Sequence, residues 1–220
     1  MVAVPELIIF DCDGVLVDSE PLAAAALAAE LADAGIETTA QECLDHFTGL
    51  SMESVIACIE DRWRRRLPAT FRERLKERDY DAFRRHLRPI PGVEALLSSL
   101  TTPKCVASSG SLEKLEVTLT ATGLMTHFAP NVFSAEQVAR GKPAPDLFLY
   151  AAERMGASPD RCFVVEDSIA GVTAARAAGM DVIGYAGGGH ANGGYGERLR
   201  AAGAEQVVST MEGLAAELTR

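Results

Sequence analysis

Two aspartates, Asp11 and Asp13, lie two residues apart directly after a short apolar segment at 7–10. The segment is brief and rich in β-branched and aromatic side chains, so we expect a buried parallel strand rather than a helix. Ligands of open α/β sheets bind beyond the carboxyl ends of the strands, where both carboxylates fall. Carboxylates this close repel each other unless a cation lies between them or one holds a proton. The pair therefore predicts a metal ion, a nucleophile and an acid.

Three further groups of polar residues follow other apolar segments that we expect to be strands. They are Ser108 with Ser109, Lys142 in the sequence Gly-Lys-Pro, and the adjacent acids Glu166 and Asp167. Parallel strands align their carboxyl ends at one edge of a sheet, so these groups would meet Asp11 and Asp13. Two adjacent acids at a buried strand end need a compensating charge, and magnesium prefers oxygen ligands. The four groups together predict one site around a divalent cation.

Each of these groups also has an ordinary structural interpretation. An aspartate at a strand end can cap a loop, and most lysines are solvated. The Ser-Ser-Gly-Ser run at 108–111 can start a helix, with Ser111 as its cap. Glycine and proline beside Lys142 are poor residues for a surface helix and favour a shaped loop instead. The order and placement of the four groups favour the shared site.

Residues 11–19 match the pattern D-x-D-G-x-[LV]-x-D-[ST], directly after the expected strand. With the three later groups, the chain resembles the haloacid dehalogenase superfamily, closest to its β-phosphoglucomutase-like, sugar-phosphatase group. The resemblance covers essentially the whole chain. Hydrolytic dehalogenases of the superfamily usually lack an acid at the position of Asp13, because a halide leaves without a proton. Asp13 therefore favours phosphate chemistry.

The resemblance implies a role for each candidate residue. Asp11 would be the nucleophile that forms an aspartyl phosphate, and Asp13 the general acid and then base. The Ser108 hydroxyl and the Ser109 N–H would hold the phosphoryl oxygens, and Lys142 would neutralise them together with Asp11. A magnesium ion would be held by Asp11, the backbone carbonyl of Asp13 and Asp167, with Glu166 acting on a metal-bound water. Gly14 suits a tight turn beside the phosphate.

Two positions bear on which phosphate reaction is catalysed. The mutase pattern has an arginine in a turn of the cap, here 48–52, where this chain has Met52. It has a histidine early in the first cap helix, where this chain has Ala23. A mutase must hold a second phosphate and resist hydrolysis, so both departures favour a phosphatase. The alternatives are a phosphomutase or a non-catalytic protein that binds a phosphorylated metabolite.

Short apolar segments alternate with helical patterns outside the stretch 18–88. They predict a doubly wound, mainly parallel α/β sheet of the Rossmann-like type, built from 1–17 and 89–220. Strands are expected near 7–10, 104–107, 132–133, 162–165, 182–184 and 206–208. Residues 18–88 show helical patterns only, with Ser19 and Ser51 as expected caps, and the resemblance makes this segment a cap domain. The glycine-rich stretch 184–196 lacks a phosphate-loop pattern and is expected to be a surface loop.

Ten arginines lie between Arg62 and Arg88, interleaved with acidic residues. Mixed charges at helical spacing are typical of a solvated face with ion pairs within one helix. The functional alternative is that one or two of these arginines point toward an anionic substrate. Trp63 stands alone, and we expect it to pack between helices.

The 220 residues carry a formal net charge of −10, which opposes binding to nucleic acid and to anionic membranes. The five cysteines are odd in number and lack C-x-x-C spacing, so neither a disulfide framework nor a zinc site is expected. The sequence shows no leader pattern and no apolar run of transmembrane length. We expect a cytoplasmic monomer whose partner is a small phosphorylated metabolite.

Overall fold

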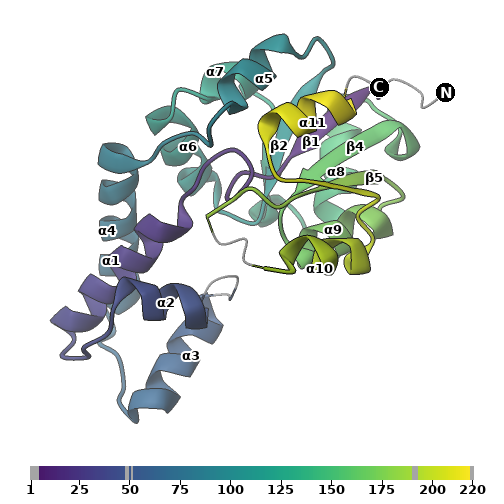
Figure 1. The fold of residues 1–220 in the computed structure, drawn as a ribbon. Coiled ribbons are helices and arrows are strands. Elements are labelled where there is room, and N and C mark those ends of the chain that lie inside the picture. The colour runs from purple at the N-terminus through teal and green to yellow at the C-terminus, as the bar shows by residue number, and fades with distance from the viewer. Residues whose placement is uncertain (1–4, 48–49, 51, 190–192, 219–220) are drawn as a thin grey trace. The chain divides into compact units, whose positions relative to one another are not determined.

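The computed structural model describes residues 5–47, 50, 52–189 and 193–218. The chain divides into two compact units (Figure 1). The first, here the core unit, comprises Met1–Asp18 and Arg88–Arg220, and the second, here the helical unit, comprises Ser19–Leu87. Within the described residues, no helix is both long enough and apolar enough to span a bilayer.

The described residues of the core unit form one parallel sheet of six strands. The strands are β1 (Leu7–Phe10), β2 (Lys104–Ser108), β3 (Val132–Ser134), β4 (Cys162–Glu166), β5 (Asp181–Tyr185) and β6 (Gln206–Val208). Their order in the sheet is β3-β2-β1-β4-β5-β6, and every adjacent pair is parallel. The sheet confirms the predicted α/β class. Because β1 is central, with β2 and β4 beside it, the residues that follow these three strands share one edge.

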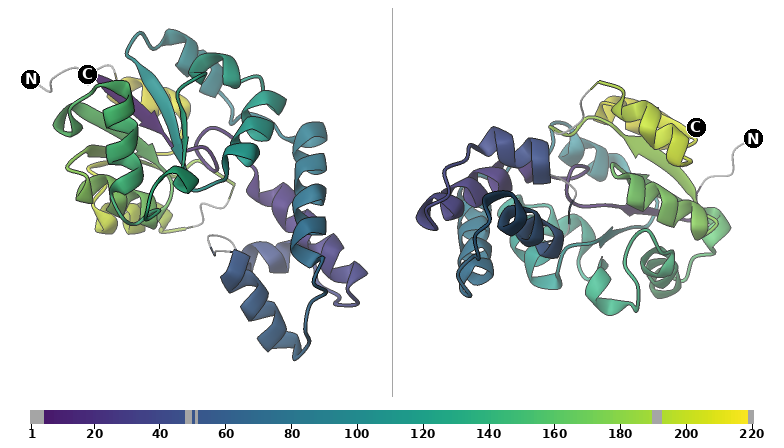
Figure 2. Two further views of the ribbon diagram at one scale, coloured as in Figure 1. Left: turned by 180° about the vertical axis from the view of Figure 1, so that it is seen from behind. Right: turned by 90° about the horizontal axis from the view of Figure 1, so that it is seen from below.

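All four residues of β1 are fully buried, because helices cover both faces of the sheet (Figure 2). On one face Leu7 and Ile9 join a cluster with Phe148 of α8 (Asp146–Met155) and Val172 of α9 (Ile169–Ala177). On the other face Phe10 packs edge-on against Phe128, with ring centroids 6.0 Å apart. A strand buried on both sides explains why its sequence is continuously apolar rather than alternating.

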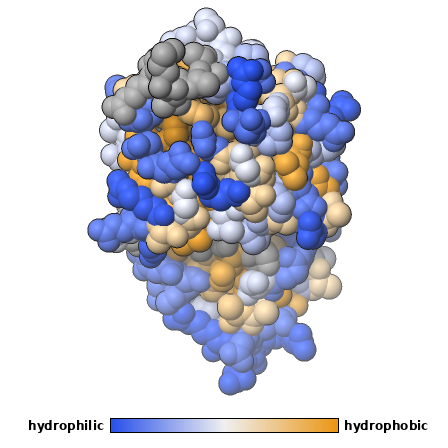
Figure 3. Space-filling view, turned by 90° about the vertical axis from the view of Figure 1, so that its right-hand side faces the viewer, coloured by the Kyte–Doolittle hydropathy of each residue, from blue (hydrophilic) through white to orange (hydrophobic). Residues whose placement is uncertain are grey.

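The remaining described elements of the core unit lie between these strands or follow the last of them. They are α5 (Val93–Ser99), α6 (Leu112–Ala121), α7 (Met125–Phe128), α10 (Tyr195–Ala202), α11 (Met211–Leu218) and the 3-10 turns Ala135–Gln137 and Pro159–Arg161. The helices α6, α8, α9 and α11 each follow a strand, as the alternation of apolar segments and helical patterns predicts. The short helices α5, α7 and α10 were not predicted, and α10 begins inside the glycine-rich stretch at 184–196. On the face in Figure 3, hydrophilic residues are interspersed with smaller hydrophobic areas.

The helical unit consists of α1 (Glu20–Asp33), α2 (Ala40–Phe47), α3 (Met52–Trp63) and α4 (Phe71–His86), with no strand among its described residues. Its core gathers side chains from all four helices, among them Leu31, Ile59 and Leu75. Trp63 packs against this cluster, as expected. Ser19 is not the side-chain cap that we expected, because its backbone is already helical (φ −85°, ψ −21°), whereas a capping residue is normally extended. Ser51, the other expected cap, lies outside the described residues.

Part of the arginine-rich stretch joins helices to one another. Arg74 and Arg78 of α4 both form ion pairs with the buried Glu30 of α1, at 3.0 and 3.2 Å. Both also reach Asp33, at 2.9 and 2.7 Å. The expected pairs within one helix occur as well, between Arg84 or Arg85 and Asp81. The stretch therefore stabilises the packing of α1 on α4 in addition to forming a solvated face.

Candidate active site

Backbone hydrogen bonds fix the turn that follows β1 and carries Asp11 and Asp13. The Asp11 N–H donates to the Val165 carbonyl at 3.0 Å, which continues the pairing of β1 with β4 by one residue. The chain then turns tightly, and the Gly14 N–H donates to the Val17 carbonyl at 2.8 Å. Gly14 has φ of +76°, a backbone conformation that glycine adopts without strain. The two aspartates therefore stand on either side of Cys12 at the start of a rigid turn.

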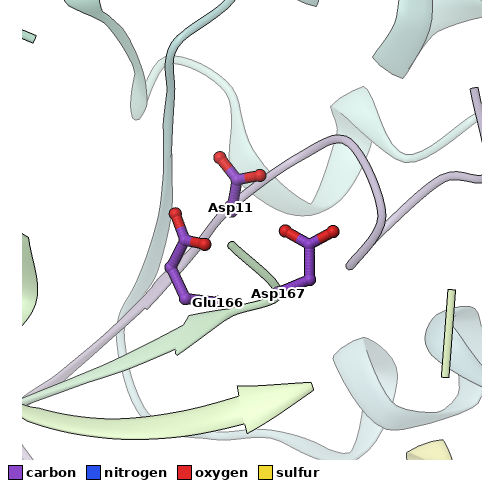
Figure 4. Close-up of side chains that lie close together, drawn as sticks. All are labelled: Asp11, Glu166 and Asp167. Carbon is purple, nitrogen blue, oxygen red and sulfur yellow. The ribbon is translucent and has the colours of Figure 1, made fainter. Parts of the chain in front are cut away.

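Three carboxylates meet at the carboxyl ends of β1 and β4. Asp11, Glu166 and Asp167 each offer an oxygen, and these oxygens lie within 4.8 Å of one another (Figure 4). Their exposed fractions are 7%, 0% and 6%. Removing three acids from water is unfavourable unless positive charge compensates them. The structure thus brings together three of the residues that the sequence singled out.

Lys142 places its ammonium against this cluster. Its Nζ donates to Asp11 Oδ1 at 2.8 Å, to Glu166 Oε1 at 2.5 Å and to the Ala107 carbonyl at 3.0 Å. Burial alone would lower the pKa of Lys142, but Asp11 and Glu166 outweigh it and raise that pKa above its usual range. Lys142 is therefore a fixed cation beside the proposed nucleophile.

Asp11 itself has a perturbed protonation equilibrium. Burial raises the pKa of Asp11 to about 7, although Lys142 acts in the opposite direction and Glu166 adds to the increase. A carboxylate with this pKa is poised between its charged and neutral forms near neutral pH. Shifts of this kind, produced by burial and specific charged neighbours, are typical of functional sites.

Glu166 is anchored on its far side as well. Its Oε2 accepts hydrogen bonds from the backbone N–H of Ser168 at 2.8 Å and from the Ser168 hydroxyl at 2.9 Å. The Ser168 hydroxyl in turn accepts from the Gly171 N–H at 2.9 Å, so Ser168 caps α9. A β-carbon at Gly171 would lie only 1.8 Å from Glu166 Oε1. Glycine at 171 therefore leaves the space in which Glu166 reaches Lys142.

Asp13 points to a partner that the sequence did not single out. Its Oδ2 accepts from Lys114 Nζ at 2.7 Å, and both side chains are partly exposed. Lys114 lies in the first turn of α6, three residues after Ser111. The sequence carried a signal for this contact. Ser111 marks the start of the helix after β2, that helix begins at the same sheet edge as Asp13, and Lys114 follows three residues later.

The two serines after β2 differ in their environment. Ser108 is 1% exposed, and its hydroxyl accepts from the Gly110 N–H at 3.2 Å. Ser109 is exposed in the following turn. Ser111 caps α6 by accepting from the Lys114 N–H at 3.1 Å, so the structural interpretation of this serine holds. Ser108 lies on the strand next to β1, at the edge where the acids gather.

The donor set suits a hard divalent cation. With all three acids ionised, Asp11, Glu166 and Asp167 carry three negative charges, and Lys142 supplies one positive charge. Asp13 and Lys114 form a balanced pair nearby. Magnesium takes oxygen ligands and is commonly held by few protein carboxylates plus substrate phosphate. These three buried carboxylates, each with an oxygen within reach of the others, fit such an ion.

The model of the haloacid dehalogenase-like hydrolases matches residues 5–179. The chain belongs to this family. It is 32% identical over 179 residues to the 6-phosphogluconate phosphatase of Escherichia coli K12, covering 81% of each protein. It is 31% identical over 176 residues to the fructose-1-phosphate phosphatase YqaB of the same strain, covering 80% of this chain and 94% of that protein.

Solved structures agree with this family membership. A conserved haloacid dehalogenase-like protein of unknown function from Agrobacterium tumefaciens shares 41% identity with a TM-score of 0.85, and the match covers 97% of each chain. With phosphatases as its relatives, this member of the family is a phosphoric monoester hydrolase. Two positions and one turn bear on mutase activity, and part of the turn lies outside the described residues. Ala23 lies in α1 and Met52 begins α3, while 48, 49 and 51 lie outside the described residues.

Proposed function

We propose that this protein is a Mg²⁺-dependent phosphatase that hydrolyses a small sugar or sugar-acid phosphate through an aspartyl-phosphate intermediate. The proposal rests mainly on the buried cluster of Asp11, Glu166 and Asp167, whose carboxylate oxygens lie within 4.8 Å of one another beside the ammonium of Lys142. The names of its relatives, which act on 6-phosphogluconate and fructose 1-phosphate, support the substrate class.

In the proposed first step, a carboxylate oxygen of Asp11 attacks phosphorus and the bond to the leaving alcohol oxygen breaks. Asp13 gives its proton to that oxygen, so the product leaves as an alcohol. Lys142, fixed 2.8 Å from Asp11, offsets the charge that two anions bring together. The Ser108 hydroxyl and the Ser109 N–H would orient the phosphoryl oxygens.

In the second step water attacks the aspartyl phosphate, and Asp13 takes the proton of that water. The bond between phosphorus and Asp11 breaks, which restores the carboxylate and releases inorganic phosphate. The magnesium ion would be held by Asp11, Asp167 and the backbone carbonyl of Asp13. Glu166 lies in the same cluster and pairs with Lys142. When bound, the ion supplies positive charge that neutralises the phosphate and orients it for in-line attack.

The helical unit is proposed to act as a cap that excludes water and selects the substrate, with the turn at 48–52 as its specificity segment. The proposal also includes a cytoplasmic monomer. Light scattering coupled to size-exclusion chromatography would test the monomer, and a mass near twice 23.4 kDa would contradict it.

The decisive experiment measures phosphate release from a panel of sugar, polyol and sugar-acid phosphates, with Mg²⁺ and with a chelator. We expect Mg²⁺-dependent turnover, abolished by Asp11→Asn, a substitution close in size that removes the nucleophilic oxygen. Absence of turnover across the panel would contradict the proposal. Isomerisation that requires a bisphosphate primer, without net release of phosphate, would instead identify a phosphomutase.

A further inference from the structure

The ion pair between Lys114 and Asp13 joins α6 to the turn after β1. The two residues are 101 positions apart in the chain, and their charged atoms are 2.7 Å apart. The side chain of Lys114 is 29% exposed and that of Asp13 is 26% exposed. Such a pair is half shielded from water, so it restricts the rotation of both side chains more than a fully solvated pair would.

The backbone of Lys114 is fixed from several directions. Its N–H donates to the Ser111 hydroxyl at 3.1 Å, and the preceding turn is held by the bond from Leu112 N–H to Glu136 Oε2 at 3.0 Å. The carbonyl of Gly110 accepts from the buried Ser134 hydroxyl at 2.6 Å. The first turn of α6 is therefore bound to the end of β3 and cannot shift independently.

The stem of Lys114 is guided as well. A β-carbon at Gly110 would lie 3.3 Å from Lys114 Cδ, so the methylene chain runs closely over the glycine backbone. With the backbone and the stem both held, the position of the ammonium is set before any substrate arrives. The carboxylate of Asp13 is then held at Oδ2 by a cation whose own freedom is small.

We propose that Lys114 is a positioning residue for Asp13. It holds the Asp13 carboxyl group at Oδ2, so that a proton carried on Oδ1 passes to the leaving alcohol oxygen as the P–O bond breaks. In the second half-reaction the same orientation lets Asp13 accept the proton of the attacking water. The inference rests on the proposed function, because it gives Asp13 the role of acid and base.

The orientation of an acid matters only where the leaving group needs a proton. The hydroxyl oxygen of a sugar leaves poorly as an alkoxide, whereas p-nitrophenolate leaves readily without protonation. Losing a well-placed general acid costs roughly 100- to 10,000-fold in rate, and a misplacement of about 1 Å can cost about 100-fold. A defect in the position of Asp13 must therefore slow sugar phosphates much more than p-nitrophenyl phosphate.

The test compares kcat/KM for p-nitrophenyl phosphate with kcat/KM for the best singly phosphorylated neutral sugar of the panel. We expect Lys114→Met to lower the value for the sugar phosphate at least about tenfold more than that for the aryl ester. The loss should fall mainly in kcat. Lys114→Arg, which keeps a cation, should restore most of the ratio. Lys104→Met, at the opposite end of β2, is the matched control and should leave the ratio unchanged.

Asp13→Asn gives the reference for complete loss of the acid. If Lys114 acts through Asp13, the double variant Asp13→Asn/Lys114→Met should show the same substrate ratio as Asp13→Asn alone. Thermal melting of each variant separates these effects from unfolding.

Four outcomes would overturn the inference. They are equal loss on both substrates, no loss, a loss confined to sugar phosphates that carry a second anionic group, or additive losses in the double variant. The third would make Lys114 a direct contact of the substrate. A wild-type protein inactive on every ester would instead overturn the proposed function, and with it the role of Asp13.

Discussion

Each unit of this protein contains a buried glutamate paired with cations, and the two pairs differ in what surrounds them. The side chain of Glu30, in the helical unit, is 3% exposed, and its partners Arg74 and Arg78 are 48% and 38% exposed. Glu166, in the core unit, is fully buried, and its partner Lys142 is only 3% exposed. Glu30 pairs with cations that remain in contact with water, whereas Glu166 pairs with a cation that is itself buried.

The two clusters also differ in charge balance. In the helical unit Glu30 and Asp33 face Arg74 and Arg78, so two negative charges meet two positive ones. In the core unit the one ammonium of Lys142 pairs with two carboxylates, those of Asp11 and Glu166, and the buried Asp167 lies beside them. Carboxylates buried this close together are destabilising, so a cluster that serves only packing has no reason to gather three of them. The crowding of carboxylates therefore distinguishes the site from the structural network.

The largest effect is expected from Lys142→Met, which leaves Glu166 and Asp11 buried without their cation. Removing one partner of a buried pair costs about 3–5 kcal/mol. We expect a loss of stability of this order in urea unfolding with a chelator present, a smaller loss with saturating Mg²⁺, and a loss of phosphatase activity of at least about 100-fold. A variant as stable as the wild type without metal would show that the cluster is not under electrostatic strain.

Gly171→Ala tests the second side of the same cluster. The new methyl group would lie 1.8 Å from Glu166 Oε1, so the carboxylate must move away from Lys142. Overpacking a tight site costs about 1–3 kcal/mol, and we expect a stability loss in this range together with reduced kcat. Gly193→Ala is the control, because a β-carbon there meets no atom within 4 Å. Equal melting temperatures for the two variants would contradict the prediction.

The raised pKa of Asp11 predicts how metal binding depends on pH. Burial raises the pKa of Asp11 to about 7, and a metal binds the ionised carboxylate, so a bound proton must leave first. The apparent affinity for Mg²⁺ should therefore fall as pH decreases below about 7, approaching about tenfold per pH unit, and level off above it. Isothermal titration calorimetry at about pH 5.5, 6.5 and 8 would measure the affinity for Mg²⁺ on both sides of this pKa. Affinity independent of pH would contradict the prediction.

The same pKa has a consequence for the metal-free protein. Between the unfolded pKa near 3.9 and the folded pKa, the folded state binds more protons than the unfolded state. The contribution of Asp11 to stability should therefore decrease as pH rises through this window. Added Mg²⁺ should offset that decrease most strongly at the upper end, which thermal melts with and without the metal would show.

The smallest effect is expected from Arg78→Met in the helical unit. Arg74 still pairs with Glu30, and Arg78 is well exposed, so the change in unfolding free energy should be at most about 1 kcal/mol. Phosphatase activity per folded molecule should be unchanged if these arginines serve packing. A selective rise in KM would instead favour the alternative that an arginine of this stretch contacts an anionic substrate.

The sequence predicted the sheet well because each strand is a short apolar run that ends in polar residues. Asp11, Glu166, Asp167 and Lys142 could be grouped because parallel strands share an edge. Their geometric proximity in the structure does not test their catalytic roles, which stay predictions. Lys114 was missed although its place in the first turn of the helix after β2 pointed to this sheet edge, and its pairing with Asp13 in particular depends on how α6 lies against the turn after β1.

Local rules failed where the surrounding structure overrides them. Ser19 has the residue type of a helix cap, yet its backbone angles are already helical and its side chain makes no capping hydrogen bond. The helices α5, α7 and α10 are too short for periodicity to identify. Contacts of Arg74 and Arg78 with α1 were missed because spacing along α4 says nothing about a neighbouring helix.

The central place of β1 has a consequence for synthesis of the protein. This strand is synthesised before the other five described strands, and its neighbours β2 and β4 begin only at Lys104 and Cys162. A wholly apolar segment must therefore wait without its pairing partners while most of the chain is made, and such exposed strands are prone to aggregation. Nascent chains that end before Cys162 should depend on chaperones, and their dependence should drop once β4 has emerged.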